Sequence, residues 1–254
     1  MKNRVLFELS RIESQRKVRV LLAVESGSRA WGFASTDSDY DIRFIYVHER
    51  DWYLSVFDAR DVVEEMLPER LDISGWDLRK TLRLFSKCNL ALNEWLGSPI
   101  TYSVVPEFRN LFVQMIPHYF NPIAAMHHYR SMANRAIAEN LMNDRIAIKK
   151  LFYVLRPLLA CRWIEHTAAQ PPTEFQKLIT PEWVNADEKS WIGSLLEQKG
   201  IASEKQTISL DRAALETIQS ELARYKSAAE LVAAPSKTNM LGLDRFFRDW
   251  VESR

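Results

Sequence analysis

The sequence predicts an α/β (α+β) fold, in which a small mixed-sheet domain is followed by an all-helical domain. In the stretch 39–47, DYDIRFIYV, every second side chain is apolar or aromatic (Tyr40, Ile42, Phe44, Tyr46), and the charged Asp39, Asp41 and Arg43 alternate with them, which is typical of a strand with one buried face. From about residue 116 onward, helix-forming residues dominate. Only 7 of the 254 residues are glycine, which favours helices over a loop-rich or all-β protein. We therefore expect a first domain over 1–115 and a helical domain over 116–254 that closes a cleft.

The elements of the first domain are predicted from local patterns. The apolar residues within 3–15 recur at helical spacing, and the run VRVLLAV at 18–24 has the length of a buried strand and is too short for a helix. Asp77 is well placed as the N-cap of a helix that follows it, LRKTLRLFSKCN. The other elements expected here are strands over 39–47, 58–66 and 70–77, of which 58–66 has the weakest pattern.

The second domain is expected to consist of helices separated by short breaks. A long helix-forming region is interrupted near residues 143 and 144, and the prolines in AAQPPTE and LITPE end further segments. Additional helices are expected over 187–199, 211–232 and 241–252.

Composition excludes several classes of protein. The chain has 34 basic and 33 acidic residues, so its net charge of +1 points neither to nor away from nucleic acid. Its two cysteines do not make a disulfide framework. The N-terminal segment lacks a secretory pattern, and no apolar run reaches the roughly 20 residues needed to span a bilayer, so we expect a cytoplasmic protein without membrane contact. His127 and His128 have no partners at ligand spacing, so no zinc site is expected.

Two carboxylates on the 39–47 strand suggest a metal site. Asp39 and Asp41 are two residues apart, so they face the same side at a spacing of roughly 6–7 Å. Two anions this close raise one pKa unless a cation lies between them, and paired carboxylates suit Mg²⁺ bound together with phosphate oxygens. Taken alone, the pair fits the solvated face of a strand better than a site. Asp37, which precedes the strand, is expected to shape the turn, and Glu25 receives no role.

The turn before that strand offers groups that bind phosphate. Gly27 allows close approach of a backbone, Ser28 supplies a hydroxyl and an N–H, and Arg29 supplies a guanidinium. A phosphate-binding turn followed by paired carboxylates favours phosphoryl or nucleotidyl transfer over a solvated acidic strand. The chain has no GxGxxG or Walker A motif, so the dinucleotide-binding and P-loop classes are not supported.

The stretch GSRAWGFASTDSDYDIRFIYV resembles the signature of the DNA polymerase β-type nucleotidyltransferases, in which Gly-Ser and a spacer precede Asp-x-Asp on a strand. It is more similar still to a subgroup of predicted nucleotidyltransferases of RNA repair pathways, associated with RNA ligases. The segments DISGWDLRKTLRLFSKCNLALNEWLGSPITY and KKLFYVLRPLLACRWI add to this resemblance. Together the matching segments cover most of 20–165.

The resemblance implies a third carboxylate on a neighbouring strand, and two residues qualify. Asp72, in the apolar–acid–apolar pattern LDI, is the preferred candidate. Asp77, in WDL, would face the opposite side and competes as a helix cap, so it is the alternative third ligand. The implied catalytic set is Asp39, Asp41 and Asp72, which would hold two Mg²⁺ ions, with Mn²⁺ as a substitute, while Asp72 helps to deprotonate the attacking hydroxyl.

Basic residues on two predicted helices are candidates for binding the nucleotide. Lys149, Lys150, Tyr153 and Arg156 fall within about a third of one helix circumference, which fits either a phosphate-binding edge or a solvated basic face. Lys80 lies one turn into the helix after Asp77 and is a further candidate.

The expected reaction is transfer of NMP from an NTP such as ATP, with release of pyrophosphate. The resemblance implies an RNA end as the acceptor, in repair or tailing. Three alternatives remain open: a protein acceptor, as in antitoxins that AMPylate toxins; a small-molecule acceptor; and, from another class, a catalytically silent module that senses a nucleotide. The sequence does not indicate the base preference or the oligomeric state.

Overall fold

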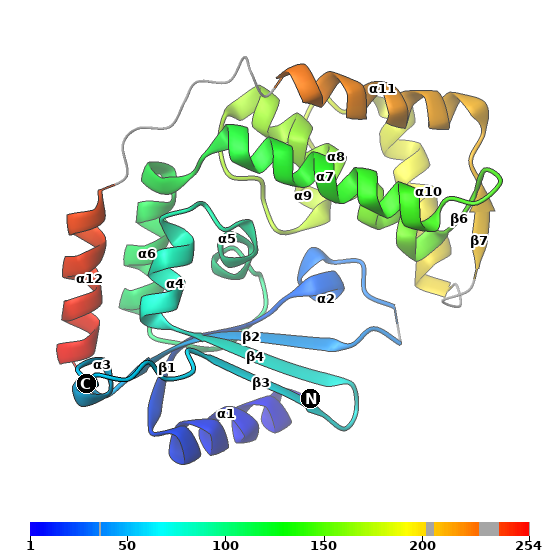
Figure 1. The fold of residues 1–254 in the computed structure, drawn as a ribbon. Coiled ribbons are helices and arrows are strands. Elements are labelled where there is room, and N and C mark those ends of the chain that lie inside the picture. Colours follow the sequence, from blue (N-terminus) through cyan, green and yellow to red (C-terminus); the bar gives the residue numbers. More distant parts are fainter. Residues whose placement is uncertain (36, 202–205, 229–238, 254) are drawn as a thin grey trace. The chain divides into compact units, whose positions relative to one another are not determined.

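The computed structural model describes residues 1–35, 37–201, 206–228 and 239–253. The chain forms two compact units, and each unit is built from more than one stretch of the chain (Figure 1). The first unit consists of Met1–Ala30, Ser38–Tyr119 and Ser236–Arg254, and the second consists of Trp31–Asp37 and Phe120–Pro235.

A five-stranded mixed sheet forms the centre of the first unit (Figure 1). The strand order is β3-β4-β2-β1-β5, in which β2 and β4 are parallel and the other neighbours are antiparallel. The parallel pair is notable because it aligns the N-terminal ends of two strands that are far apart in sequence. The strands are β1 (Val18–Glu25), β2 (Tyr40–His48), β3 (Val62–Leu67), β4 (Leu71–Asp77) and β5 (Thr101–Val104).

Helices cover both faces of this sheet, and alternation along the strands decides which side chain meets which face. Ile42, Phe44 and Tyr46 of β2 share one apolar cluster with the helix α1 (Lys2–Arg16). Ile45 and Val47 belong to a second cluster, formed with the other helices of this unit. Those helices are α4 (Leu78–Phe85), α5 (Leu90–Leu96), α6 (Pro106–Tyr119) and α12 (Met240–Glu252); the short helices α2 (Gly27–Trp31) and α3 (Arg50–Tyr53) follow β1 and β2.

Helices dominate the second unit, as predicted, although it is not purely helical. The strands β6 (Arg145–Ala147) and β7 (Thr207–Ser209) form a small antiparallel pair, which the sequence analysis did not anticipate because each strand has only three residues. The first of these strands follows the predicted break near residues 143 and 144 directly. The helices are α7 (Pro122–Asn140), α8 (Ile148–Thr167), α9 (Phe175–Ile179), α10 (Ala186–Ile201) and α11 (Arg212–Ala228).

Two segments belong to the other unit than the one expected from a division of the chain between residues 115 and 116. The helix α12 belongs to the first unit, because its residues Leu243, Phe246 and Trp250 pack into the core of that unit. The segment Trp31–Asp37 belongs to the second unit, in which Phe33 packs against the rings of other phenylalanines. The end of the predicted helix 211–232, from residue 229 onward, lies outside the described residues.

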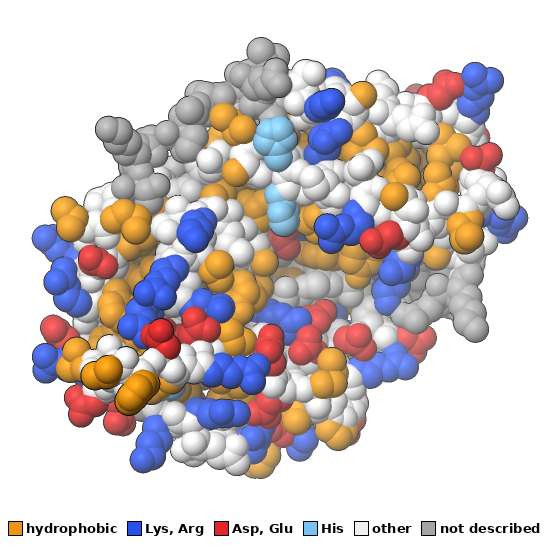
Figure 2. Space-filling view, viewed as in Figure 1, with side chains coloured by type: hydrophobic (Ala, Val, Ile, Leu, Met, Phe, Trp, Pro, Cys, Tyr) orange, Lys and Arg blue, Asp and Glu red, His pale blue; other side chains and the backbone are white. Residues whose placement is uncertain are grey.

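The surface carries a mixture of charges. On the face drawn in Figure 2, Lys and Arg side chains are interspersed with Asp and Glu side chains, in keeping with the net charge of +1. None of the helices in the described ranges combines the length and the apolar character that a membrane crossing requires.

Candidate functional site

Parallel pairing of β2 and β4 brings two predicted carboxylates together. In the register of this pair, Asp41 is the partner of Asp72. Residues that are opposite each other in a sheet project to the same face, so both carboxylates lie at the N-terminal ends of the two strands, on the face that carries Ile45. Their side chains are 28% and 29% exposed, which leaves both open to solvent on one side.

A guanidinium lies between these two carboxylates. Nη2 of Arg43 donates to Oδ1 of Asp41 at 3.2 Å and to Oδ2 of Asp72 at 2.7 Å. Arg43 follows Asp41 by two residues on the same strand, so alternation places it on the same face. The Arg43 guanidinium therefore bridges the two carboxylates, a role that the sequence did not predict.

The turn before α2 packs directly against Asp41. Gly27 has φ of +60°, and a Cβ atom built on it would lie 2.3 Å from Oδ2 of Asp41. The adjacent Ser26 N–H donates to the Asp41 carbonyl at 2.8 Å. Glycine is required here both by its left-handed backbone and by the close approach of the carboxylate. The predicted phosphate-binding turn and the predicted carboxylate thus form one local structure, in which Ser28 is buried.

Asp39 and Arg29 lie at the start of β2. Asp39 immediately precedes the strand and is exposed, and repulsion from its charge helps to raise the pKa of the Asp41 carboxyl. Arg29 donates from Nε to the Asp39 carbonyl at 2.9 Å and from Nη2 to the Ser38 carbonyl at 2.7 Å. Its guanidinium also stacks over the ring of Tyr40, with 3.7 Å to the centroid. Arg29 therefore holds the backbone that leads into the strand, while its binding of phosphate stays a prediction.

The electrostatics of Asp41 favour a further cation. The pKa of its carboxyl group is raised, mainly by burial and in addition by repulsion from Asp72 and Asp39. Arg43 and Arg29 lower this pKa, but by less. Oxygen ligands of this kind are those that Mg²⁺ prefers, so the donor set fits the expected metal. In the described ranges, no three Asp, Glu, His or Cys side chains are already arranged to hold a metal ion. Arg43 already donates to one oxygen of each of Asp41 and Asp72, so a metal ion bound here would share these carboxylates with it.

Glu25 holds the backbone of Asp41 from the interior of the unit, a role that the sequence did not predict. It is fully buried, and its Oε1 accepts from the Asp41 N–H at 2.7 Å, while Oε2 accepts from the Tyr102 hydroxyl at 2.5 Å. The Ser98 hydroxyl donates to the Glu25 carbonyl at 2.6 Å. Burial is the main cause that raises the pKa of the Glu25 carboxyl. The available signal was an acidic residue at the end of an otherwise apolar strand, where a charge needs hydrogen-bonding partners.

The predicted nucleotide-binding residues of α8 lie in the second unit. Arg156 is 2% exposed, stacks over Trp31 at 4.4 Å and donates from Nη2 to the Thr173 carbonyl at 3.4 Å. The ring of Tyr153 meets the edge of Trp31 at 5.6 Å, and Lys150 lies over the Tyr153 ring at 5.7 Å. The buried Arg156 is part of the interior of this unit and is not on a solvated basic face.

Three comparisons with known proteins bear on the identity of the chain. A model of the RNA repair pathway DNA polymerase beta family, RlaP, matches residues 1–249. The chain belongs to this family. The resemblance drawn from GSRAWGFASTDSDYDIRFIYV is thereby confirmed, and the chain is a member of a polymerase β-type family of nucleotidyltransferases.

Among curated proteins, the chain is similar to the uncharacterized protein YcgL of Bacillus subtilis (strain 168). The two are 43% identical over 256 residues, which cover 99% of this chain and 97% of that protein. Among solved structures, it is similar to a nucleotidyltransferase-like protein from Exiguobacterium sibiricum 255-15, at 11% identity, with 96% of this chain and 79% of that chain covered. The TM-score of 0.31 is too low for this likeness to support an argument.

In this RlaP family member, Asp77 has a structural environment. It is fully buried, its Oδ1 accepts from the Arg79 N–H at 2.8 Å as the N-cap of α4, and its Oδ2 accepts from the Tyr53 hydroxyl at 2.5 Å. Five residues of strand, about 17 Å, separate it from Asp72. Its side chain also points to the opposite face, because Asp77 is the register partner of Tyr46. The geometry therefore favours Asp72 as the third carboxylate.

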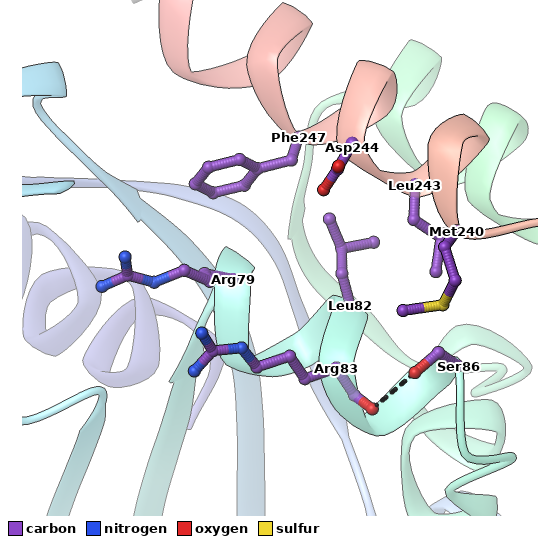
Figure 3. Close-up of a pocket in the computed structure, with 8 residues that line it drawn as sticks. All are labelled: Arg79, Leu82, Arg83, Ser86, Met240, Leu243, Asp244 and Phe247. Carbon is purple, nitrogen blue, oxygen red and sulfur yellow. Dashed lines mark hydrogen bonds between the residues drawn. The ribbon is translucent and has the colours of Figure 1, made fainter.

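Two further features of the first unit lie apart from the carboxylates. Lys80 forms an ion pair with Asp61, with 3.0 Å between Nζ and Oδ1, so its predicted contact with the nucleotide gains no support. A cavity of about 230 Å³ lies between α4 and α12 (Figure 3). It contains none of the predicted site residues; its lining is Arg79, Leu82, Arg83, Ser86, Met240, Leu243, Asp244 and Phe247.

Proposed function

We propose that this protein is a Mg²⁺-dependent nucleotidyltransferase that transfers NMP from an NTP to an RNA end. The observation that carries the proposal is the arrangement at the N-terminal ends of β2 and β4, where Gly27 packs against the Asp41 carboxylate and Asp72 is the register partner of Asp41. Membership of an RNA repair family favours RNA as the acceptor. Transfer would join the acceptor oxygen to the α-phosphorus of the NTP and break the bond to the bridging oxygen, so that pyrophosphate leaves.

The residues of the first unit have distinct roles in this proposal. Asp39, Asp41 and Asp72 would hold the metal ions, and those ions supply charge neutralisation for the triphosphate and alignment of the attacking oxygen. Asp72 accepts the proton that the acceptor hydroxyl loses. The turn at Gly27 and Ser28 offers its backbone N–H groups to phosphate oxygens next to the carboxylates, because the missing side chain at Gly27 lets this turn pack against Asp41.

Glu25 and Arg29 act as positioning residues. The backbone of Asp41 is fixed from both sides, because its N–H donates to Glu25 and its carbonyl accepts from Ser26. Arg29 fixes the two residues before the strand in the same manner. Such fixed geometry matters for transfer, since a displacement of about 1 Å at a reacting centre can cost about a hundredfold in rate.

The proposal is tested by measuring which acceptor receives the label from NTPs that are labelled at the α-phosphate. The four NTPs are incubated with Mg²⁺ and an RNA oligonucleotide, and we expect label to move to the RNA. Label on protein would instead indicate a protein acceptor, label on a small molecule would indicate a small acceptor, and binding without transfer would indicate a nucleotide sensor. Absence of any Mg²⁺-dependent nucleotide binding refutes the proposal.

Two variants on one strand provide a matched pair for this assay. Asp72→Asn should abolish transfer, because it removes a charge from the exposed carboxylate site. Asp77→Asn should retain transfer, because Asp77 is buried on the other face. The reverse result would assign the third carboxylate to Asp77.

A further inference from the structure

The cavity between α4 and α12 has an apolar lining (Figure 3). Leu82 and Leu243 are buried behind it, Phe247 is half-buried, and Met240 is 60% exposed. The ring of Phe247 is held by an edge-to-face contact with Tyr53, with 4.9 Å between the centroids. Pockets for drug-sized ligands measure about 300–1,000 Å³. The smaller volume of about 230 Å³ therefore suits a single flat ring system better than a whole nucleoside triphosphate.

Two arginines of α4 line the same cavity, one helical turn apart. Figure 3 shows the guanidinium groups of Arg79 and Arg83 projecting from the helix in the same direction. Neither group forms an ion pair or a hydrogen bond with the residues that the structure describes. Arg79 lies over the rings of Trp52 and Tyr53, at 5.5 Å and 5.2 Å from their centroids, which fixes its position and leaves its N–H groups available. Because like charges one turn apart repel each other, an anion beside both arginines is favoured.

Asp244 of α12 adds an acceptor to this lining. It is exposed, and no ion pair joins it to Arg79 or Arg83. Carboxylates accept hydrogen bonds from the amino groups of nucleobases, as Asp and Glu do with cytosine. Apolar surface for a ring, an acceptor for its amino group and donors for a phosphate together match one nucleotide unit of a single strand.

We propose that this cavity holds one base of the RNA acceptor strand, with the adjoining phosphate on Arg79 and Arg83. The inference rests on the proposed function for the identity of the strand. Leu82 of α4 packs with Ile45 on the face of the sheet that carries Asp41 and Asp72, so the cavity and the carboxylates belong to the same side of this unit. The start of α4 is five residues of strand, about 17 Å, beyond Asp72. The cavity therefore binds a nucleotide several positions away from the reacting end.

Fluorescence anisotropy with a labelled single-stranded RNA of about twelve nucleotides, in the presence of EDTA, tests the site. The double variant Arg79→Gln/Arg83→Gln should bind at least tenfold more weakly than the wild type. The slope of log affinity against log salt should fall by about 1.4, since each phosphate contact contributes about 0.7. If the double variant does not fold, Arg83→Gln alone, at an exposed position, should bind at least threefold more weakly. The control Arg16→Gln replaces an exposed arginine of α1, which covers the other face of the sheet, and should bind as the wild type does.

A second variant tests insertion of the base. Ser86→Phe fills the cavity without changing its charge, so we expect it to bind the RNA at least tenfold more weakly. Unlabelled single strand should compete well. An RNA duplex of the same length, whose bases are paired, should compete poorly, and so should poly-glutamate of the same charge and AMP.

The proposal is overturned if the wild type does not bind the RNA, if the arginine variants or Ser86→Phe bind it as tightly as the wild type, or if duplex, poly-glutamate or AMP competes as well as the single strand. Its failure is distinguishable from failure of the proposed function. Asp41→Asn should bind the RNA normally although it has lost transfer, and the double arginine variant should still transfer to a dinucleotide acceptor, which is too short to reach the cavity. If RNA binding depends on the cavity but no acceptor receives a nucleotide, the site stands and the proposed function falls. Transfer to a dinucleotide with normal RNA binding by the cavity variants would give the reverse conclusion.

Discussion

Replacing Arg43 by methionine removes the guanidinium that lies between the Asp41 and Asp72 carboxylates, and we expect it to tighten metal binding. Nη2 is 3.2 Å and 2.7 Å from the two carboxylate oxygens. Two unit charges about 4 Å apart interact by about 1 kcal/mol in water and about 4 kcal/mol at an effective dielectric constant of about 20. Since both carboxylates are more than a quarter exposed, a value near the limit for water is appropriate, about 0.7–1.4 kcal/mol for each carboxylate and about 1.4–2.8 kcal/mol for the two together.

A metal ion that binds these carboxylates competes with that interaction. A competition of about 1.4–2.8 kcal/mol corresponds to a tenfold to hundredfold change in affinity. Arg43→Met should therefore bind Mn²⁺ about tenfold to a hundredfold more tightly than the wild type. Without metal the variant should be less stable, because two carboxylates face each other without their cation, and Mn²⁺ should raise its melting temperature more than that of the wild type.

Titration of free Mn²⁺ by electron paramagnetic resonance measures the affinity, and thermal unfolding with and without Mn²⁺ measures the stability. Arg83→Met, which replaces an exposed arginine of the same unit, is the matched control and should change neither. Equal or weaker Mn²⁺ binding by Arg43→Met would show that Arg43 does not compete with the metal. If the wild type and both variants bind no Mn²⁺, the proposed metal site itself is wrong.

Three other substitutions have distinct expected outcomes. Gly27→Ala introduces a Cβ at 2.3 Å from Asp41 Oδ2 and places an alanine in a left-handed backbone conformation. We expect the free energy of unfolding, measured in urea, to fall by about 1–3 kcal/mol and transfer to slow at least a hundredfold. Near-normal transfer would contradict the close packing of Gly27 against Asp41. Asp77→Asn should lower the unfolding free energy by about 1–2 kcal/mol while transfer per folded molecule persists; a fully stable but inactive variant would contradict this. Lys199→Met should be more stable at pH 7 by about 3 kcal/mol, because the pKa of the lysine falls from 10.5 to about 8 on folding. Between these pH values the unfolded wild type binds more protons, so wild-type stability rises with pH and the difference should vanish above pH 10.5; a difference that does not depend on pH, measured by urea unfolding, would contradict burial of the charge.

Much of the acidic site followed from the sequence because alternation along a strand is a local property. The pattern of 39–47 placed Asp39 and Asp41 on one face, and the same rule separated Asp72 from Asp77 before any pairing was known. The N-cap role of Asp77 was also predicted, and it is confirmed because the Asp77 carboxylate accepts from the Arg79 N–H at the start of α4.

The secondary structure between α4 and α7 was not predicted from the sequence. The elements α5, β5 and α6 were not predicted there, and β5 has only four residues. Short edge strands carry little periodicity, so their pairing depends on the strand beside them, here β1.

The sequence by itself determined the strand that carries Asp41, the turn at Gly27 and the family, because each depends on residues that are close together along the chain. Only the tertiary structure decided that Asp72 lies opposite Asp41, that Arg43 bridges them and that Glu25 holds the strand from behind. The contacts of Asp72 with Asp41 and Arg43 join strands that are about thirty residues apart in sequence. The role of Glu25 depends on its burial beside β2. Strand register is chosen by the apolar faces that the whole sheet must bury, and no short stretch of sequence contains that information.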